Sequence, residues 1–140
     1  MNYSNPFPVA IPAVEAIGQQ ARIVIVDMHA EATSEKVAMG WHLDGIASLV
    51  VGTHTHVQTA DETILPNGAA YITDLGMTGP HDSVIGVGKE MVVRKFLTQL
   101  PAKFEVATGD TLLCGVYVEI DERTRRATLI ERLRLPCEDA

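Results

Sequence analysis

The chain has 140 residues, which is room for one domain, and 46% of them are apolar and 21% charged. These proportions are typical of soluble globular proteins rather than of disordered or fibrous ones. Eleven Lys and Arg against 18 Asp and Glu give a net charge of −7, which disfavours binding to duplex DNA or to a membrane surface. Cys114 and Cys137 lie far apart, which argues against a disulfide scaffold and a thiolate zinc site.

The N-terminal segment does not have the pattern of a signal peptide. No basic residue precedes its apolar stretch, and Pro6, Pro8 and Pro12 interrupt it. No run of the chain reaches the roughly 18 apolar residues of a membrane span. We therefore expect a cytoplasmic protein in a reducing setting, with a first helix over residues 9–20.

The next segment predicts a β-α-β unit. Residues 22–27 and 46–51 are short β-branched runs, typical of parallel strands that are buried on both faces. Residues 33–43 predict the helix between them, with Thr33 or Ser34 as its N-cap. A parallel pair of strands is the expected result.

Downstream of this unit the pattern changes to alternating strands and glycine-rich connections. We therefore expect an α/β fold, a layered sandwich whose C-terminal part is mostly antiparallel. The expected elements are a hairpin over 63–73 that turns at 66–68, an ordered loop over 74–88, a helix over 89–100, and an antiparallel strand pair over 112–121 and 127–135.

Three histidines follow the predicted parallel strands. His29 comes just after the first strand, and His54 and His56 come just after the second. The carboxyl ends of neighbouring parallel strands meet at one edge of a sheet, where ligands bind in α/β folds. Side chains two residues apart in an extended segment point to the same side. Because imidazole binds zinc, iron and related ions, the spacing predicts a metal site.

Carboxylates and hydroxyls flank this predicted site. Asp27 and Glu31 bracket His29, and either carboxylate can accept a hydrogen bond from a metal-bound imidazole or ligate directly. Alternatively, Asp27 only ends a strand and Glu31 is only solvated. Thr53 and Thr55 either shape the loop or contact phosphate, with loop shape favoured, and Asp74 either orients a ligand or forms an ordinary turn.

Three further residues are not assigned to the predicted metal site. Gly52 is expected to let the backbone leave its strand in a conformation that other residues avoid. His42 is expected on the surface of its helix. His81, in a loop, is expected to border a site, with no partner that the sequence identifies.

Four blocks of sequence resemble one known family over residues 5–132. They are DMHAEATSEK (27–36), GTHTHVQTAD (52–61), TDLGMTGP (73–80) and FLTQLP (96–101). These blocks are similar to the YmdB-type bacterial metallophosphoesterases. That family belongs to the calcineurin-like superfamily and is associated with 2′,3′-cyclic nucleotide phosphodiesterase activity.

The resemblance implies a site with two metal ions, usually iron or manganese, with zinc as an alternative. His29 and His54 would bind one ion and His56 the other. Two ions would clamp the phosphoryl oxygens of a phosphate ester and activate a water molecule for attack on phosphorus.

The resemblance covers only the C-terminal half of the family, whose members are about twice as long. The other half carries an Asp, a bridging Glu, an Asn ligand and the histidine thought to assist the leaving group, so the catalytic residues remain unknown for this chain. We expect residues 1–140 to form the C-terminal half of a metallophosphoesterase domain, with exposed apolar surface on the β-α-β unit. The expected partner is an N-terminal-half polypeptide or a second copy of the chain.

Four functional interpretations are open at this point. The first is a metal-dependent phosphodiesterase that needs the other half for full activity. The second is a non-catalytic metal-binding or assembly module. The third is a mononuclear zinc hydrolase that uses three histidines and water, with Glu31 as its general base. The fourth is an inactive truncated fragment with no independent role.

Overall fold

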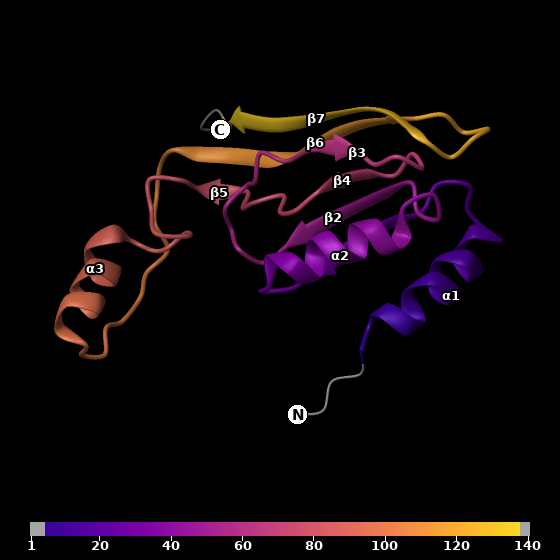
Figure 1. The fold of residues 1–140 in the computed structure, drawn as a ribbon. Coiled ribbons are helices and arrows are strands. Elements are labelled where there is room, and N and C mark those ends of the chain that lie inside the picture. Colours follow the sequence, from indigo (N-terminus) through magenta and orange to yellow (C-terminus); the bar gives the residue numbers. More distant parts are fainter. Residues whose placement is uncertain (1–4, 138–140) are drawn as a thin grey trace.

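The computed structural model describes residues 5–137, which form two sheets and three helices (Figure 1). The first sheet has the strand order β1-β2-β4-β3 and the second has the order β5-β6-β7. In chain order the elements are α1 (Phe7–Gly18), β1 (Ile25–His29), α2 (Thr33–Leu43), β2 (Leu49–Thr53), β3 (Thr63–Ile64), β4 (Ala70–Ile72), β5 (Gly79–Pro80), α3 (Lys89–Thr98), β6 (Thr111–Ile120) and β7 (Ala127–Pro136).

The predicted β-α-β unit is present. Strand β1 pairs with β2 in parallel, and the register places Asp27 beside Val51 and His29 beside Thr53. Strand β4 extends the sheet on the other side of β2, also in parallel. The carboxyl ends of β1 and β2 therefore meet at one edge, as the sequence predicts.

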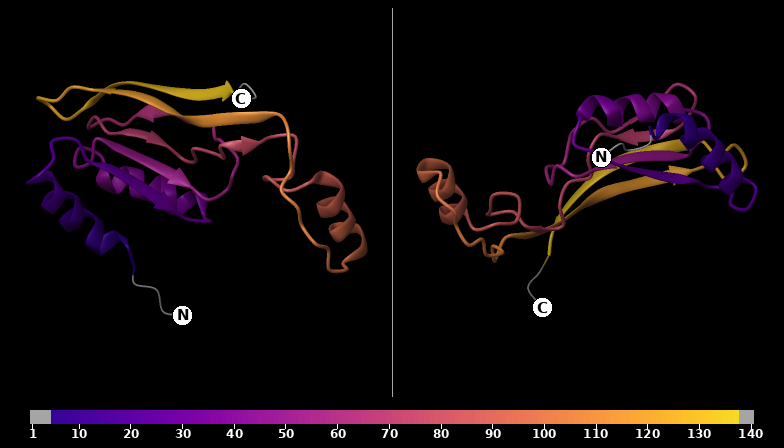
Figure 2. Two further views of the ribbon diagram at one scale, coloured as in Figure 1. Left: turned by 180° about the vertical axis from the view of Figure 1, so that it is seen from behind. Right: turned by 90° about the horizontal axis from the view of Figure 1, so that it is seen from below.

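The two faces of the first sheet are covered by different layers (Figures 1 and 2). Val50 on β2 belongs to a core cluster with Met39 and Leu43 of α2, on the helical face. Leu49 and Val51 belong to a second cluster, packed against apolar residues of β6 and β7. The alternation of side chains along β2 thus produces the predicted layered α/β sandwich.

Strand β1 differs from the prediction. The sequence predicts burial on both faces, but β1 is an edge strand with one neighbour, and Ile25 is 59% exposed. Trp41 on α2 is 57% exposed, so the expectation of exposed apolar surface on the β-α-β unit is confirmed. Strand β2, between two neighbours, is buried as predicted.

The helix ends also differ in detail from the prediction. Ala32 stands at the N-cap of α2 and no side chain caps the helix, so neither Thr33 nor Ser34 has the predicted role. Helix α3 ends two residues early, where Gln99 adopts a left-handed conformation with φ of 57°. The predicted hairpin and the C-terminal strand pair are confirmed.

Helix α3 projects away from both sheets (Figures 1 and 2). Val92 is buried, but Val93, Phe96 and Leu97 are open to solvent, and Phe96 is 75% exposed. No helix among residues 5–137 has the length and apolar character needed to cross a bilayer.

Candidate functional site

His29 ends β1 and is oriented by a chain of polar contacts. Its Nδ1 lies 2.9 Å from the Thr53 hydroxyl, and that hydroxyl donates a hydrogen bond of 2.8 Å to Asp27. Because the hydroxyl has only one proton, it accepts from the Nδ1–H of His29. The Nε2 atom of His29 is therefore left with a free lone pair.

His54 lies against His29 from the loop after β2. The two rings meet edge to face with centroids 5.0 Å apart. His54 Nε2 lies 2.5 Å from a Glu31 carboxylate oxygen, which accepts its proton. The Nδ1 atom of His54 then faces the Nε2 atom of His29 at 3.1 Å.

When both rings are neutral, neither of these two nitrogens carries a proton, so their 3.1 Å approach suits a shared proton or a cation placed between or beside them. Two nitrogen ligands about 2.1 Å from a tetrahedral ion are about 3.4 Å apart, close to the separation of His29 and His54. The two side chains thus fit a metal ion chemically. Among residues 5–137, however, no group of three or more His, Cys, Asp or Glu side chains is arranged to hold one.

His56, the third predicted ligand, has a different neighbour. Its Nδ1 lies 3.1 Å from the Ile85 carbonyl oxygen, so Nδ1 carries the proton and Nε2 is free. In the described part of the chain His56 makes no hydrogen bond to His29 or His54. The structure therefore brings two of the three imidazoles into direct contact and anchors the third to the loop before α3.

The loop that carries the last two histidines has an unusual backbone. His54 has φ of 119° and His56 has φ of 65°, conformations that residues with a side chain seldom adopt and that cost about 1–3 kcal/mol each. Hydrogen bonds hold the loop between them, because Thr55 Oγ1 contacts the backbone of Val57 and Asp74 accepts from the Thr55 N–H. Thr55 thus shapes the loop, the interpretation that the sequence favours.

A buried ion pair fixes this loop to the sheet. Lys36 and Asp74 are both fully buried, with 2.8 Å between Nζ and Oδ2, and Asp74 also accepts from the Gly76 N–H. Burial by itself raises the pKa of Asp74, but hydrogen bonds from Lys36, Thr55 and Gly76 outweigh it and bring the pKa below 3.8. Sequence reasoning missed Lys36, because a helical lysine is usually solvated.

Gly52 has a role different from the predicted one. Its φ is not positive, so it does not supply an unusual conformation. A Cβ atom at this position would instead lie 1.7 Å from the Thr73 carbonyl oxygen. Glycine is needed because β2 and the chain after β4 approach too closely for any side chain.

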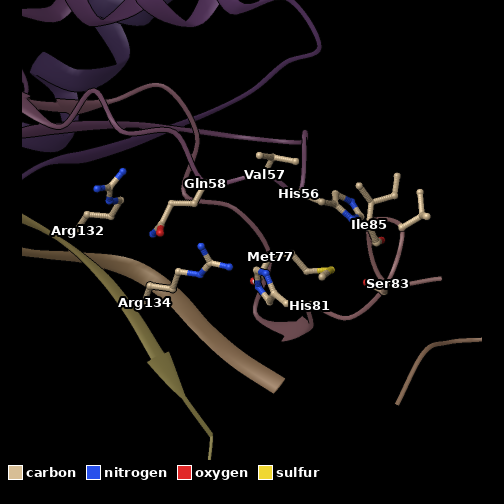
Figure 3. Close-up of a pocket in the computed structure, with 10 residues that line it drawn as sticks. His56, Val57, Gln58, Met77, His81, Ser83, Ile85, Arg132 and Arg134 are labelled. Carbon is tan, nitrogen blue, oxygen red and sulfur yellow. Dashed lines mark hydrogen bonds between the residues drawn. The ribbon is translucent and has the colours of Figure 1, made fainter. Parts of the chain in front are cut away.

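A pocket of about 700 Å³ adjoins His56 (Figure 3). Sequence reasoning did not identify Arg132 and Arg134 as part of a site, although their spacing of two in a strand places them on one face. His81, which the sequence placed near a site, lies 3.0 Å from the Met77 carbonyl oxygen. The lining residues are His56, Val57, Gln58, Met77, His81, Ser83, Val84, Ile85, Arg132 and Arg134.

His42 lies away from this region. Its Nε2 is 3.0 Å from the Phe7 carbonyl oxygen, and its ring contacts the Phe7 ring between α1 and α2. It is half-buried, so the predicted surface position is wrong, because α1 packs over this part of α2.

The fold and the site define a layered α/β protein with histidines and carboxylates at the carboxyl edge of a parallel sheet. Residues 1–133 match the family described as YmdB-like protein. The chain belongs to this family.

Related proteins have the same sequence pattern and fold. The chain is 52% identical over 129 residues to the 2′,3′-cyclic-nucleotide 2′-phosphodiesterase of Bacillus subtilis, covering 92% of this chain and 49% of the relative. A crystal structure described as a novel phosphatase from Mycoplasma pneumoniae has a TM-score of 0.87 at 40% identity, over 97% of this chain and 48% of that one. A crystal structure of a hypothetical protein from Thermus thermophilus has a TM-score of 0.80 at 40% identity, with 97% and 54% covered. The chain thus spans about half the length of the relatives it matches.

Proposed function

We propose that this chain is part of a metal-dependent phosphodiesterase and that His29 and His54 hold one of its metal ions. The observation that carries the proposal is the 3.1 Å approach of two ring nitrogens whose other nitrogens are engaged by Thr53 and Glu31. The relationship to a Bacillus subtilis cyclic-nucleotide phosphodiesterase at 52% identity supports the reaction class. Iron or manganese is the proposed metal.

The residues around the two imidazoles have defined tasks in this proposal. Glu31 holds the proton on Nε2 of His54, and Thr53, itself fixed by Asp27, holds the proton on Nδ1 of His29. The lone pairs of His29 Nε2 and His54 Nδ1 therefore face each other and are available to a metal ion. The chemistry that a metal ion supplies when bound here is stabilisation of negative charge on the phosphoryl oxygens.

His56 is proposed as the ligand of a second ion. Its Nδ1–H is held by the Ile85 carbonyl, so Nε2 is the nitrogen available for coordination. The separate anchoring of His56, away from the His29–His54 pair, supports this division.

We propose that residues 1–140 form the C-terminal half of a metallophosphoesterase domain and that the other half of the domain completes the site. The chain spans about half the length of its relatives, and β1 has an open edge with Ile25 exposed. An added strand at this edge would cover apolar surface and bring further ligands to the two histidines. The substrate proposed for the completed site is a 2′,3′-cyclic nucleotide.

The decisive experiment measures metal binding and turnover in the same samples. We expect the chain to bind Mn²⁺ and His54→Ala to lose at least about tenfold in affinity. The matched control His42→Gln should keep wild-type affinity, because His42 lies between the two helices. Hydrolysis of adenosine 2′,3′-cyclic phosphate should appear or rise when the N-terminal half of the Bacillus subtilis relative is added as a separate polypeptide.

The outcomes separate the functional interpretations. Equal Mn²⁺ affinity in the wild type and His54→Ala would contradict the proposed centre. Metal binding without turnover, even after addition of the other half, would favour a non-catalytic metal-binding module.

A further inference from the structure

The pocket beside His56 is basic, although the chain carries a net charge of −7. Its lining includes the side chains of Arg132 and Arg134, and no Asp or Glu among residues 5–137 lines it. Guanidinium groups bind phosphate oxygens through a planar fork of N–H donors. The charge and chemistry of the lining therefore suit an anion.

The two arginines differ in how they are held. Arg132 donates to the Thr59 carbonyl oxygen at 3.2 Å, and its Nε lies 3.7 Å from Glu62. Arg134 has no side-chain hydrogen bond or ion pair with any residue from 5 to 137, and its guanidinium points toward Met77 and His81 (Figure 3). Within the described residues, one guanidinium that is held and one that has no partner thus lie on the same face of β7.

The floor of the pocket is fixed as well. Gln58 Nε2 donates to the carbonyl oxygens of Gly115 on β6 and Leu133 on β7, at 3.1 Å and 2.9 Å. This side chain ties the loop after His56 to the second sheet. The position of the arginines relative to His56 is therefore set by direct hydrogen bonds rather than by a free loop.

The pocket adjoins the proposed metal centre through His56, the proposed ligand of the second ion, which is one of its lining residues; His29 and His54 do not line it. A mononucleoside cyclic phosphate has a single phosphate, which the metal centre would take. That leaves the arginine end of the pocket without an anion.

We propose that Arg132 and Arg134 form a subsite for a second phosphate, so that the substrate is the cyclic-phosphate end of a short oligonucleotide. The inference rests on the proposed function for the position of the cyclic phosphate. The subsite itself follows from the charge of the lining, from the Arg134 guanidinium that has no partner among residues 5–137, and from the pocket that the arginines share with His56.

The test compares three ligands by titration calorimetry with the 140-residue chain in the absence of metal. They are adenosine 2′,3′-cyclic phosphate, the diadenosine dinucleotide with a 2′,3′-cyclic phosphate end, and the same dinucleotide with a neutral methylphosphonate linkage. We expect the charged dinucleotide to bind about tenfold more tightly than either of the others, the effect of one charge-assisted contact.

Substitutions of Arg134 test whether the tighter binding of the charged dinucleotide depends on the arginines. Arg134→Ala should abolish most of the preference for the charged dinucleotide, and Arg134→Lys should restore only part of it, because lysine lacks the planar fork. Arg123→Ala is the matched control, since Arg123 is exposed in the turn between β6 and β7 and does not line the pocket. Thermal melting of each variant checks that it is folded.

The results separate this inference from the proposed function. Equal affinity for the charged and neutral dinucleotides, or an unchanged preference in Arg134→Ala, would overturn the phosphate subsite while leaving the metal centre standing. A preserved preference together with unchanged Mn²⁺ binding by His54→Ala would support the subsite and overturn the metal centre.

Discussion

The two sides of the loop that follows β2 carry opposite charge. Toward β1, the carboxylates of Asp27 and Glu31 contact Thr53 and His54. Toward β7, Arg132 and Arg134 line a pocket to which the described residues contribute no carboxylate. The contrast places carboxylates and arginines a few residues apart on one short segment, which is the arrangement that the proposed metal centre and phosphate subsite would use.

The two sides also share one support. The Lys36–Asp74 pair holds the backbone of Thr55, which stands between His54 and His56. A substitution in the Lys36–Asp74 pair should therefore disturb both the histidine site and the arginine pocket. A substitution of Glu31 or of Arg134 should disturb only one of them.

The largest effect is expected from Lys36→Met, which leaves the buried Asp74 carboxylate without its cation. Removing one member of a buried pair typically costs about 3–5 kcal/mol in the free energy of unfolding. Urea denaturation measures this loss. Lys89→Met, which breaks the exposed pair with Asp82, should have a far smaller effect, and similar losses in both variants would contradict the assignment.

The second-largest loss of stability is expected from Gly52→Ala. The added Cβ would lie 1.7 Å from the Thr73 carbonyl oxygen, so the strand and the chain after β4 must separate, at a cost of about 1–3 kcal/mol or more. Gly115→Ala is the control, because none of the described atoms lies within 4 Å of its added Cβ. Chemical denaturation measures the free energy of unfolding of both variants under the same conditions. If Gly52→Ala is as stable as the wild type, the close approach of β2 to the chain after β4 is not the reason for glycine at this position.

Glu31→Gln should weaken only the cation-binding side. The variant loses the carboxylate that fixes the proton on His54, and such a change typically lowers metal affinity about 10–100-fold. Competition with a chelator measures the Mn²⁺ affinity. Glu35→Gln, at an acidic position in the first turn of α2, should keep the wild-type affinity, and the preference for a dinucleotide should persist in both variants.

The smallest expected effect is a gradual change in the free energy of unfolding as the pH is lowered. Hydrogen bonds hold the pKa of Asp74 below 3.8 against the opposing effect of burial, so its ionised form stabilises the fold above about pH 4, the unfolded value. This stabilisation should disappear as the pH falls through the lower pKa of the folded state. Unfolding free energies measured from neutral pH down to about pH 2.5 should show a shallower acid loss in Asp74→Asn, and parallel curves would count against the prediction.

The local pattern of the chain was sufficient to predict most elements. Continuous β-branched runs marked β1 and β2, and alternation marked β6 and β7, because these periods depend only on backbone geometry. The burial of β1 was not predictable in this way, since an edge strand and a central strand have the same composition when only the number of neighbours differs.

The candidate site was predictable to the extent that it depended on strand ends. His29 and His54 meet because parallel neighbours end at the same edge, and sequence order alone implies that arrangement. The arginine pocket was not predictable, because β7 reaches His56 only through the packing of the second sheet against the first.

The sequence by itself determined the identity of the strands, the edge at which His29 and His54 meet, and the family to which the chain belongs. Only the tertiary structure decided that Lys36 is buried, that Gly52 is required for space, and that Arg134 lines the same pocket as His56. The physical reason is that secondary structure follows from neighbours a few residues apart, whereas burial, close approach and charge pairing depend on residues that the chain brings together from far away.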